Sequence, residues 1–350
     1  MKFKLMTYNV QDLFLQTAFP IRPEYLHTLS DEHWAMLGEA DQELKPLSKL
    51  KALAQIILRE DPDCVCLCEV GGPTALSNFN EFFLSGAYVA YLIPGNSDRG
   101  IESGFLLKKS LPFTAELQTN RHWPVPFQYL HEEDPEAYAV TALMAEAFNL
   151  GASEKRRLSR DIPVLHLYDP QGTCILSVML AHLKSGYDPQ GFDPGGQKRR
   201  AAEVQALIAI YHKLKAEKSN DHPVIVAGDF NGNASRDDTW AEFQPLYEAT
   251  DLEDALFLAG IPRYERHTHM TFYGRTASAK QLDYIFLSKS LHQRLIPEET
   301  YVYRYVYDED GSEMLAPFSF RDRDLLPSDH YPVVCVVDLK DAGDEHTAAR

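Results

Sequence analysis

Residues 222–233 contain the side chains of this chain that are best placed for chemistry. Four apolar residues occupy 224–227, and Gly228, Asp229 and Asn231 follow them. The apolar run predicts a strand buried on both faces, and the glycine lets the backbone turn at its end. Asp229 and Asn231 then lie at a strand exit, where a carboxylate and an amide can point toward one substrate atom. Taken alone, the pattern fits an Asx turn better, because Asp and Asn side chains cap backbone groups in many turns.

Polar groups also lie at the ends of the other expected strands, and six such ends are hard to explain as six turns. Glu69 is the clearest case, because it follows a run of apolar residues in an expected strand over 63–70. Such a carboxylate needs a partner, since an unpaired charge is costly to bury. The expected strands over 3–10, 173–182, 281–288 and 331–339 carry, in the same way, Asn9 and Gln11, His182, Asp283, and Asp329 with His330.

This set of groups suits a hard divalent cation. It combines carboxylates, amides and two imidazoles with no thiolate, which is the ligand set of Mg²⁺ or Mn²⁺. Zinc would recruit more His or Cys. Cys64, Cys66 and Cys68 alternate along one expected strand, so they share a face that is expected to pack in the core. The odd total of five cysteines fits reduced thiols better than a disulfide framework.

The remaining pattern describes strands separated by helices, with two surface insertions. Apolar residues at helical spacing predict helices over 47–58, 73–84 and 197–215. A hairpin is expected to join 160–167 to 173–182. We expect one domain over residues 1–340, insertions near 16–45 and 111–160, a polar tail over 341–350, and shorter helices near 31–40, 135–150, 239–247 and 252–258.

Charge and hydropathy limit the function classes. The chain has 350 residues and a formal net charge of -17, which opposes broad attraction to polyanions. An anionic substrate must therefore meet local cations or a metal. The first residues lack the apolar segment of a signal peptide, and no run reaches the roughly 18 apolar residues of a membrane helix. We therefore expect a cytoplasmic protein with no membrane segment, and no obligate protein partner is inferred.

These motifs, taken in order, resemble those of the endonuclease/exonuclease/phosphatase superfamily, which includes deoxyribonuclease I. The resemblance spans residues 3–339 and implies an α/β (α+β) fold: a four-layer sandwich of two mixed β-sheets flanked by helices, with the site at one end. The matching segments are Thr7-Tyr-Asn9-Val-Gln11, Glu69, His182-Leu-Lys-Ser, Gly228-Asp229-Phe-Asn231, Leu282-Asp283-Tyr-Ile-Phe and Ser328-Asp329-His330.

The resemblance also implies a role for each matching residue. Glu69 corresponds to the principal Mg²⁺ (or Mn²⁺) ligand, and Asn9, Gln11 and Asp329 lie near the metal. Asp229 orients or deprotonates the attacking water. The other roles concern the phosphoryl group: His182 and Asn231 hold its oxygens, and His330, oriented by Asp283, stabilises the pentacovalent transition state or assists proton transfer.

Cations near the motifs are candidate phosphate-binding residues. Lys184 follows the His182 strand, and the motif context favours a phosphate contact over a solvated lysine. Arg160 precedes an expected strand, where a surface salt bridge is an equal alternative. Arg199 belongs to the run Lys198-Arg199-Arg200 at a helix start, and such runs usually belong to a solvated face.

The leading functional hypothesis is a divalent-metal-dependent phosphoesterase that cleaves phosphodiester bonds, with nucleic acid as the substrate. The segment after His182, with its Gly- and Asp-rich loop and arginine pair, resembles bacterial nuclease-like members of the superfamily. The alternative enzyme is a phosphatase or phosphodiesterase acting on a small phosphorylated metabolite, inositol phosphate or lipid headgroup. A non-catalytic binding protein of the same fold is the third possibility. It should have lost Glu69, Asp229 or His330, and the sequence keeps all three.

Overall fold

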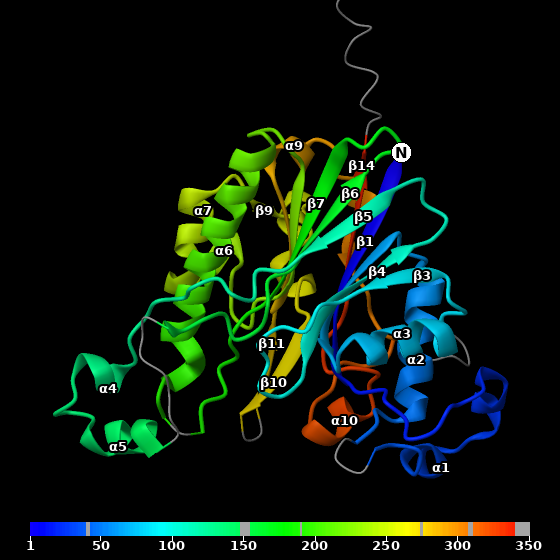
Figure 1. Cartoon of the computed structure of the whole chain (residues 1–350), viewed down its shortest axis with the longest axis horizontal. Helices are drawn as coiled ribbons and strands as arrows, with labels where there is room; N and C mark the ends of the chain where they lie inside the picture. Colours follow the sequence, from blue (N-terminus) through cyan, green and yellow to red (C-terminus); the bar gives the residue numbers. More distant parts are fainter. Residues whose placement is uncertain (40–42, 148–154, 190, 274–275, 307–310, 340–350) are drawn as a thin grey trace, which may run out of the picture.

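Two six-stranded mixed β-sheets pack face to face in the computed structural model (Figure 1). The structure describes residues 1–39, 43–147, 155–189, 191–273, 276–306 and 311–339. The first sheet has the order β13-β14-β1-β2-β4-β3 and the second the order β5-β6-β7-β8-β12-β9. The first sheet consists of β1 (Lys2–Leu13), β2 (Cys64–Val70), β3 (Tyr88–Tyr91), β4 (Glu102–Lys108), β13 (Tyr301–Val302) and β14 (Val333–Asp338).

The second sheet repeats the arrangement of the first, with one parallel pair at its centre. In the first sheet β1 runs parallel to β2, and in the second β7 runs parallel to β8. The carboxyl ends of these central strands therefore point to the same end of their sheet. The second sheet consists of β5 (Thr114–Gln118), β6 (Val164–Tyr168), β7 (Cys174–His182), β8 (Val224–Asp229), β9 (Glu253–Asp254) and β12 (Asp283–Leu287).

Helices cover the outer face of each sheet, which completes four layers (Figure 1). The helices α2 (Leu47–Glu60) and α3 (Pro73–Phe83) bury one apolar face beside the first sheet. The long helix α6 (Gln197–Lys218) packs with α7 (Gln244–Ala249) against the second. The shorter elements are α1 (Asp31–Ala35), α4 (Leu130–Glu133), α5 (Ala139–Ala147), α8 (Ala255–Leu258), α9 (Lys289–His292), α10 (Phe320–Asp324), and the 3-10 turns Pro23–Thr28, Pro194–Gly196, Arg236–Asp238, Ala241–Phe243, Arg263–Glu265 and Pro297–Glu299.

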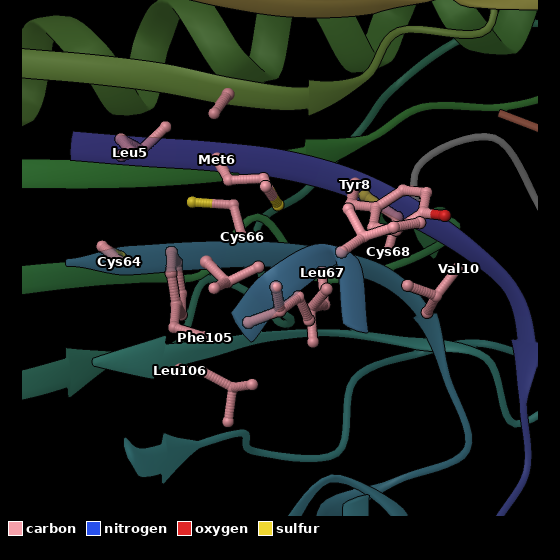
Figure 2. Packing of buried hydrophobic residues seen from close by; sticks show 14 of the residues in the cluster. Leu5, Met6, Tyr8, Val10, Cys64, Cys66, Leu67, Cys68, Phe105 and Leu106 are labelled. Carbon is pink, nitrogen blue, oxygen red and sulfur yellow. The ribbon is translucent and has the colours of Figure 1, made fainter. Parts of the chain in front are cut away.

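The main core lies between the sheets and includes the cysteine-bearing strand. Figure 2 shows Cys66 and Cys68 on β2 among apolar side chains of the neighbouring strands, including Met6 and Tyr8 of β1. Burial raises the pKa of the Cys66 and Cys68 thiols well above the ordinary value. All five cysteines of the chain are free. The prediction that the alternating cysteines belong to the packed core is confirmed.

The fold class and most strands agree with the sequence predictions, and the differences lie outside the central strands. The expected insertion near 111–160 is partly wrong, because β5 pairs antiparallel with β6 as an edge strand of the second sheet. The hairpin of β10 (His269–Tyr273) and β11 (Thr276–Lys280) was not expected. The helix expected near 239–247 forms only as a 3-10 turn followed by α7.

Several sequence predictions reach residues that the structure leaves undescribed. The helix expected near 135–150 forms only over 139–147, as α5; residues 135–138 form a turn, and residues 148–150 lie outside the described residues. The helix expected near 31–40 ends at Ala35 as α1; residues 36–39 are not helical, and residue 40 lies outside the described residues. The polar tail expected over 341–350 lies wholly outside them. No described helix combines the length and hydropathy that crossing a membrane requires.

Candidate active site

The predicted catalytic residues converge where the central strands of both sheets end. His182 is the last residue of β7, Asp229 the last of β8 and Asp283 the first of β12. Strand pairing places Asp229 opposite both His182 and Asp283, so these three side chains lie in one row across the second sheet. The first sheet faces this row with Asn9 on β1 and Glu69 on β2.

Asn9 links the carboxylates of the two sheets. Its Nδ2 atom donates to Oε1 of Glu69 at 3.3 Å and to Oδ2 of Asp229 at 3.0 Å. Its Oδ1 atom accepts the backbone N–H of Gln11 at 3.0 Å. Both amide hydrogens of Asn9 are therefore used to hold two carboxylates at a fixed separation. The Glu69 backbone has a φ of 65°, a strained value that is often found where function requires it.

His330 and Asp283 form a buried ion pair. The Nδ1 atom of His330 donates to Oδ2 of Asp283 at 2.7 Å, and Nε2 of His330 lies 4.0 Å from Oδ2 of Asp229. Burial disfavours the charged ring, but the Asp283 and Asp229 carboxylates outweigh it and raise the pKa of His330 well above its ordinary value. The ring is therefore held as a cation whose free N–H faces Asp229.

Asp229 is buried and receives hydrogen bonds from the turn that follows it. Burial, with a contribution from Asp283, raises the pKa of Asp229 to about 7, while His330, Asn231 and Asn9 oppose the rise. The backbone N–H of Asn231 donates to Oδ1 of Asp229 at 2.8 Å. The Nδ2 atom of Asn231 donates to Oδ2 of Asp229 at 3.1 Å and to the Leu183 carbonyl at 3.0 Å. The Asx-type turn after β8 and the arrangement that orients the Asp229 carboxylate are therefore one and the same structure.

His182 is a neutral imidazole between two carboxylates. Its Nε2 atom lies 3.7 Å from Oδ2 of Asp229 and 3.8 Å from Oε1 of Glu69. Burial is the main cause that lowers the pKa of His182 well below its ordinary value, and Arg160, His330 and Arg99 add to it. Its Nδ1 atom is buried and has no hydrogen-bond partner among the described residues.

The donors around Glu69 fit a hard divalent cation. Burial and then the carboxylates of Asp12 and Asp329 raise the pKa of Glu69, so like charges gather there. The buried Oε1 atom of Gln11 has no hydrogen-bond partner among the described residues. Clustered carboxylates beside an unsatisfied amide oxygen are the groups that Mg²⁺ or Mn²⁺ binds.

Two groups of His and acidic residues could also hold a metal by distance alone. The ligand atoms of Asp229, Asp283 and His330 lie within 4.8 Å of one another, and so do those of His269, Asp329 and His330. The first group does not suit a cation, because His330 uses Nδ1 to donate to Asp283 and is itself charged. The second shares the same charged ring. Glu69 and Gln11 offer only oxygen atoms as ligands, so the Glu69 region fits a cation better.

Asp329 lies beside a histidine and an arginine that the sequence analysis did not single out. Its Oδ2 atom is 3.8 Å from Nε2 of His269 and 3.7 Å from Nη1 of Arg323. Burial opposes ionisation of Asp329, but His269, His330 and Arg323 outweigh it and lower the pKa. The ring centroids of His269 and His330 are 4.7 Å apart. His269 was missed because it belongs to the unexpected β10, and its only signal was a His-Thr-His run at 267–269.

The sequence analysis also missed Asp12 and Lys45, which contact the candidate metal ligands Glu69 and Gln11. The Asp12 backbone N–H donates to Oε2 of Glu69 at 3.1 Å. Lys45 donates from Nζ to the Gln11 carbonyl at 2.7 Å, and burial lowers the pKa of Lys45 to about 8. The position of Asp12 directly after Gln11 was the one sequence signal that could have indicated its place near Glu69. Lys45 lies at the end of the expected insertion 16–45, and nothing in its local sequence indicated that it would be buried.

The three candidate phosphate-binding cations differ in how their charges are used. Lys184 donates from Nζ to the carbonyls of Ser185 at 2.8 Å and Tyr187 at 2.7 Å. Arg199 lies 3.3 Å from Oε1 of Glu203, and Arg200 is buried in an ion pair with Glu242. Arg160 forms no hydrogen bond or ion pair within the described part of the chain.

The position of Arg160 is indicated by its effect on neighbouring groups. After burial, its charge is the next cause that lowers the pKa of both His182 and Lys184. The Arg160 residue is half-buried. Among the three candidates, Arg160 has the charge that is most available to a substrate phosphate.

Comparison with known proteins decides the family. The profile of the Endonuclease/Exonuclease/phosphatase family matches residues 6–330, nearly the whole chain. The chain belongs to this family. No curated protein sequence matches the chain significantly. The prediction of a metal-dependent phosphoester hydrolase is confirmed at the level of the family, and so is the prediction that a divalent metal takes part.

Solved structures of the family share the fold at low sequence identity. The chain matches TDP2 from Danio rerio complexed with single-strand DNA product, with a TM-score of 0.55 and 16% identity over 96% of this chain and 99% of that one. It matches the human Nocturnin catalytic domain with bound sulfate anion, with a TM-score of 0.55 and 15% identity over 97% and 94%. TDP2 from Caenorhabditis elegans gives a TM-score of 0.53 and 15% identity over 96% and 74%. These matches support the four-layer fold.

Proposed function

We propose that this protein is a Mg²⁺-dependent phosphodiesterase that acts on nucleic acid. The observation that carries the proposal is the buried cluster in which Asn9 holds Glu69 and Asp229 together while His330 faces Asp229. The buried carboxylates of Asp229 and Asp283 lie here together with the half-buried Glu69, an arrangement that hydrophobic packing alone would not favour. Each of the two sheets contributes to the cluster, so its geometry depends on the whole sandwich.

The proposed metal ligands are Glu69 and Gln11, with Asn9 and Asp329 nearby. Glu69 offers a carboxylate surrounded by like charge, and Gln11 offers an unsatisfied oxygen. When bound, Mg²⁺ supplies positive charge that polarises the phosphoryl oxygens and stabilises charge on the leaving oxygen. These oxygen donors suit Mg²⁺ and Mn²⁺ alike, and we propose Mg²⁺ as the ion.

The proposed chemistry of the protein side chains is positioning and proton transfer. Asp229 holds the attacking water and accepts its proton as the water oxygen bonds to phosphorus and the ester P–O bond breaks. Asn231 orients Asp229 through two hydrogen bonds. His182 contacts a phosphoryl oxygen, and the His330 cation, oriented by Asp283, donates to an oxygen that gains charge in the transition state.

Nucleic acid is the substrate class that the surroundings of the cluster support best. Arg160 places an uncommitted cation close to His182, so a phosphate can be attracted locally although the chain is acidic overall. The structural similarity to zebrafish TDP2, whose crystal structure contains a single-strand DNA product, supports the same substrate class. A small phosphorylated metabolite remains the competing substrate, which the assay below distinguishes.

The decisive experiment measures hydrolysis by the purified protein with Mg²⁺. The substrates are single-stranded DNA, plasmid, RNA, bis-p-nitrophenyl phosphate and inositol phosphates. We expect cleavage of a nucleic acid and of the small diester, and Asp229→Asn should reduce both by about 10² or more. The control is Glu217→Gln on the exposed surface of α6, where Glu217 lies 3.8 Å from Lys213. Hydrolysis of inositol phosphates without nucleic-acid cleavage would reject the nuclease proposal.

A further inference from the structure

A pocket of about 500 Å³ is lined by residues that neighbour the catalytic cluster in the chain. Three segments form it, and each continues directly from a residue of the cluster. Asn233 follows Asn231 by two residues, Gln281 and Leu282 precede Asp283, and His267 precedes His269 by two residues. A volume of this size lies within the range of about 300–1,000 Å³ that ligand sites occupy. The lining therefore includes residues within two positions of Asn231, Asp283 and His269.

The indole of Trp240 forms a rigid wall of this pocket. The backbone N–H of Trp240 donates to the Asn233 carbonyl at 2.9 Å. Its ring packs on Gly232, where an added Cβ would lie 3.1 Å from the Trp240 Cε3 atom and 2.6 Å from a ring carbon of Phe243. The Arg200 guanidinium lies 5.6 Å from the ring centroid. The ring is thus fixed against the loop that carries Asn231, although 37% of the residue remains exposed.

A second aromatic side chain and two basic residues complete the lining. Tyr264 is 76% exposed although it lines the pocket, so its ring is available for contact. Arg263 is paired with Asp238 at 2.6 Å, but both side chains are more than half exposed and the pair is weak. Lys280 also lines the pocket. Single exposed aromatics are ordinary on protein surfaces, whereas two in one pocket with adjoining cations form a consistent recognition surface.

Aromatic faces with adjoining cations match the chemistry of an unpaired nucleobase. Every base has a π-face that can stack on Trp or Tyr, and its phosphate is attracted by Arg or Lys. An aliphatic ligand would gain nothing from the cations, and a bare phosphate would gain nothing from the rings. A base inside a duplex cannot enter such a pocket unless it leaves the stack.

We propose that the pocket between Trp240 and Tyr264 binds an unpaired base of single-stranded nucleic acid, next to the phosphate held at the Asp229 cluster. This inference rests on the proposed function, and it assigns that function a preference for single strands. The pocket adjoins Asn233, which is two residues from Asn231, so base and phosphate contacts come from one loop. Because the Trp240 indole is already fixed, it loses little conformational entropy when a base binds.

Binding assays can separate base stacking from phosphate attraction. The protein would carry Asp229→Asn to prevent cleavage, and its affinity would be measured by fluorescence anisotropy with Mg²⁺. The probes are a labelled hexathymidylate and an abasic chain with the same phosphates. We expect roughly tenfold tighter binding of the hexathymidylate, because stacking contributes to the affinity of each base. Trp240→Ala should remove most of this discrimination, and Trp240→Phe should restore part of it.

Tyr25→Ala is the matched control, since Tyr25 is 54% exposed and does not line the pocket. This control should keep the full preference for the hexathymidylate. Equal affinity for the two probes in protein without pocket substitutions, or a preference that survives both Trp240→Ala and Tyr264→Ala, overturns the inference. Discrimination only for free thymidine monophosphate would assign the pocket to a mononucleotide and reject the single-strand assignment.

The proposed function is tested separately by hydrolysis of bis-p-nitrophenyl phosphate, which has no base. A protein that discriminates the two probes but hydrolyses no phosphodiester would reject the proposed function and retain the base-binding pocket. A protein that cleaves DNA but binds both probes equally would retain the proposed function and reject the base-binding pocket. The two proposals therefore fail in distinguishable ways.

Discussion

The Nδ1 atom of His330 lies 2.7 Å from Oδ2 of Asp283, and this buried pair joins the two sheets. Asp283 begins β12 of the second sheet, and His330 lies in the segment before β14 of the first. Because Nδ1 is occupied, the ring presents Nε2 toward Asp229. One carboxylate thus fixes both the orientation and the charge of the imidazole.

Asp283→Asn should reduce turnover by roughly 10² or more, because the amide no longer stabilises the imidazolium of His330. The variant should also lower the pKa of His330, which the Asp283 and Asp229 carboxylates raise against the effect of burial. The alkaline limb of the activity profile should therefore move to lower pH. Steady-state rates of bis-p-nitrophenyl phosphate hydrolysis between pH 5 and 9 would measure both effects. A variant with unchanged rate and profile would show that the pair is structural.

Glu69→Gln should abolish the stabilisation of the protein by divalent metal. A ligand that binds only the folded state raises Tm by mass action, by a few °C at saturating concentration. Removing one ligand charge while keeping the volume should weaken Mg²⁺ or Mn²⁺ binding without unfolding the chain. Thermal unfolding with and without each metal would test this, with Glu217→Gln as the charge-matched control. An equal rise of Tm in Glu69→Gln would mean that the metal binds elsewhere.

The central strands and the residues at their ends were predictable from sequence because both depend on local patterns. Runs such as 224–227 are long enough to identify buried strands, and a polar side chain directly after the run is visible without any knowledge of tertiary structure. The parallel pairs β1–β2 and β7–β8 then bring those ends together. Asn9, Glu69 and Asp229 therefore meet where the pattern indicated.

The remaining site residues depend on contacts between distant segments, which one sequence does not show. His269 reaches the cluster only because the β10–β11 hairpin folds beside His330. Lys45 is buried because its ammonium meets the Gln11 carbonyl, 34 residues earlier in the chain. For the same reason the availability of cations could not be predicted: Arg199 lies against Glu203, whereas Arg160 remains open within the described residues.

Acid should destabilise the protein through a second buried group that lies apart from the active site. His166 Nδ1 and His222 Nε2 each lie 2.8 Å from Oγ of Ser177, and all three residues are buried. Burial, followed by the charges of Lys218, His166 and Lys215, lowers the pKa of His222 to about 4. The pKa of His166 is also lowered, chiefly by burial. The folded protein therefore keeps these rings neutral.

The sign of this effect follows from proton linkage. In the unfolded chain His222 takes up a proton near its ordinary pKa of about 6.5, whereas the folded chain resists protonation until about pH 4. The contribution to stability is complete above pH 6.5 and is lost as the pH falls toward 4. We expect a loss of roughly 2 kcal/mol from this residue, less than full linkage because the neighbouring lysines are partly screened by solvent.

Urea unfolding at pH 7.5 and 4.5 would measure this loss. His222→Gln keeps a polar group near Ser177 but cannot titrate, so its free energy of unfolding should fall less between the two pH values than that of the wild type. The control is His212→Gln, because His212 is exposed on α6 and lies outside the Ser177 network. Identical pH dependence in the wild type and His222→Gln would show that His222 does not cause the loss of stability in acid.

Arg160→Ala should weaken binding of single-stranded DNA and make it less sensitive to salt. Each phosphate contact releases counterions and contributes about -0.7 to the slope of log affinity against log salt for a single strand. Loss of Arg160 should therefore make the slope shallower by about that amount. Lys198 provides the control, since it is already paired with Glu133 at 2.7 Å on the surface, and Lys198→Ala should leave the slope unchanged.

The measurement would use Asp229→Asn protein to prevent cleavage and would follow binding from low to moderate salt. A total slope of only a few units is expected, because most of the surface is acidic and few phosphates can be neutralised. If Lys198→Ala changed the slope and Arg160→Ala did not, the nucleic acid would lie along the start of α6 instead of beside His182. Retention of the full slope in both variants would indicate that neither residue contacts phosphate, and that any attraction of the polyanion comes from the metal and the Lys280 side of the proposed base pocket.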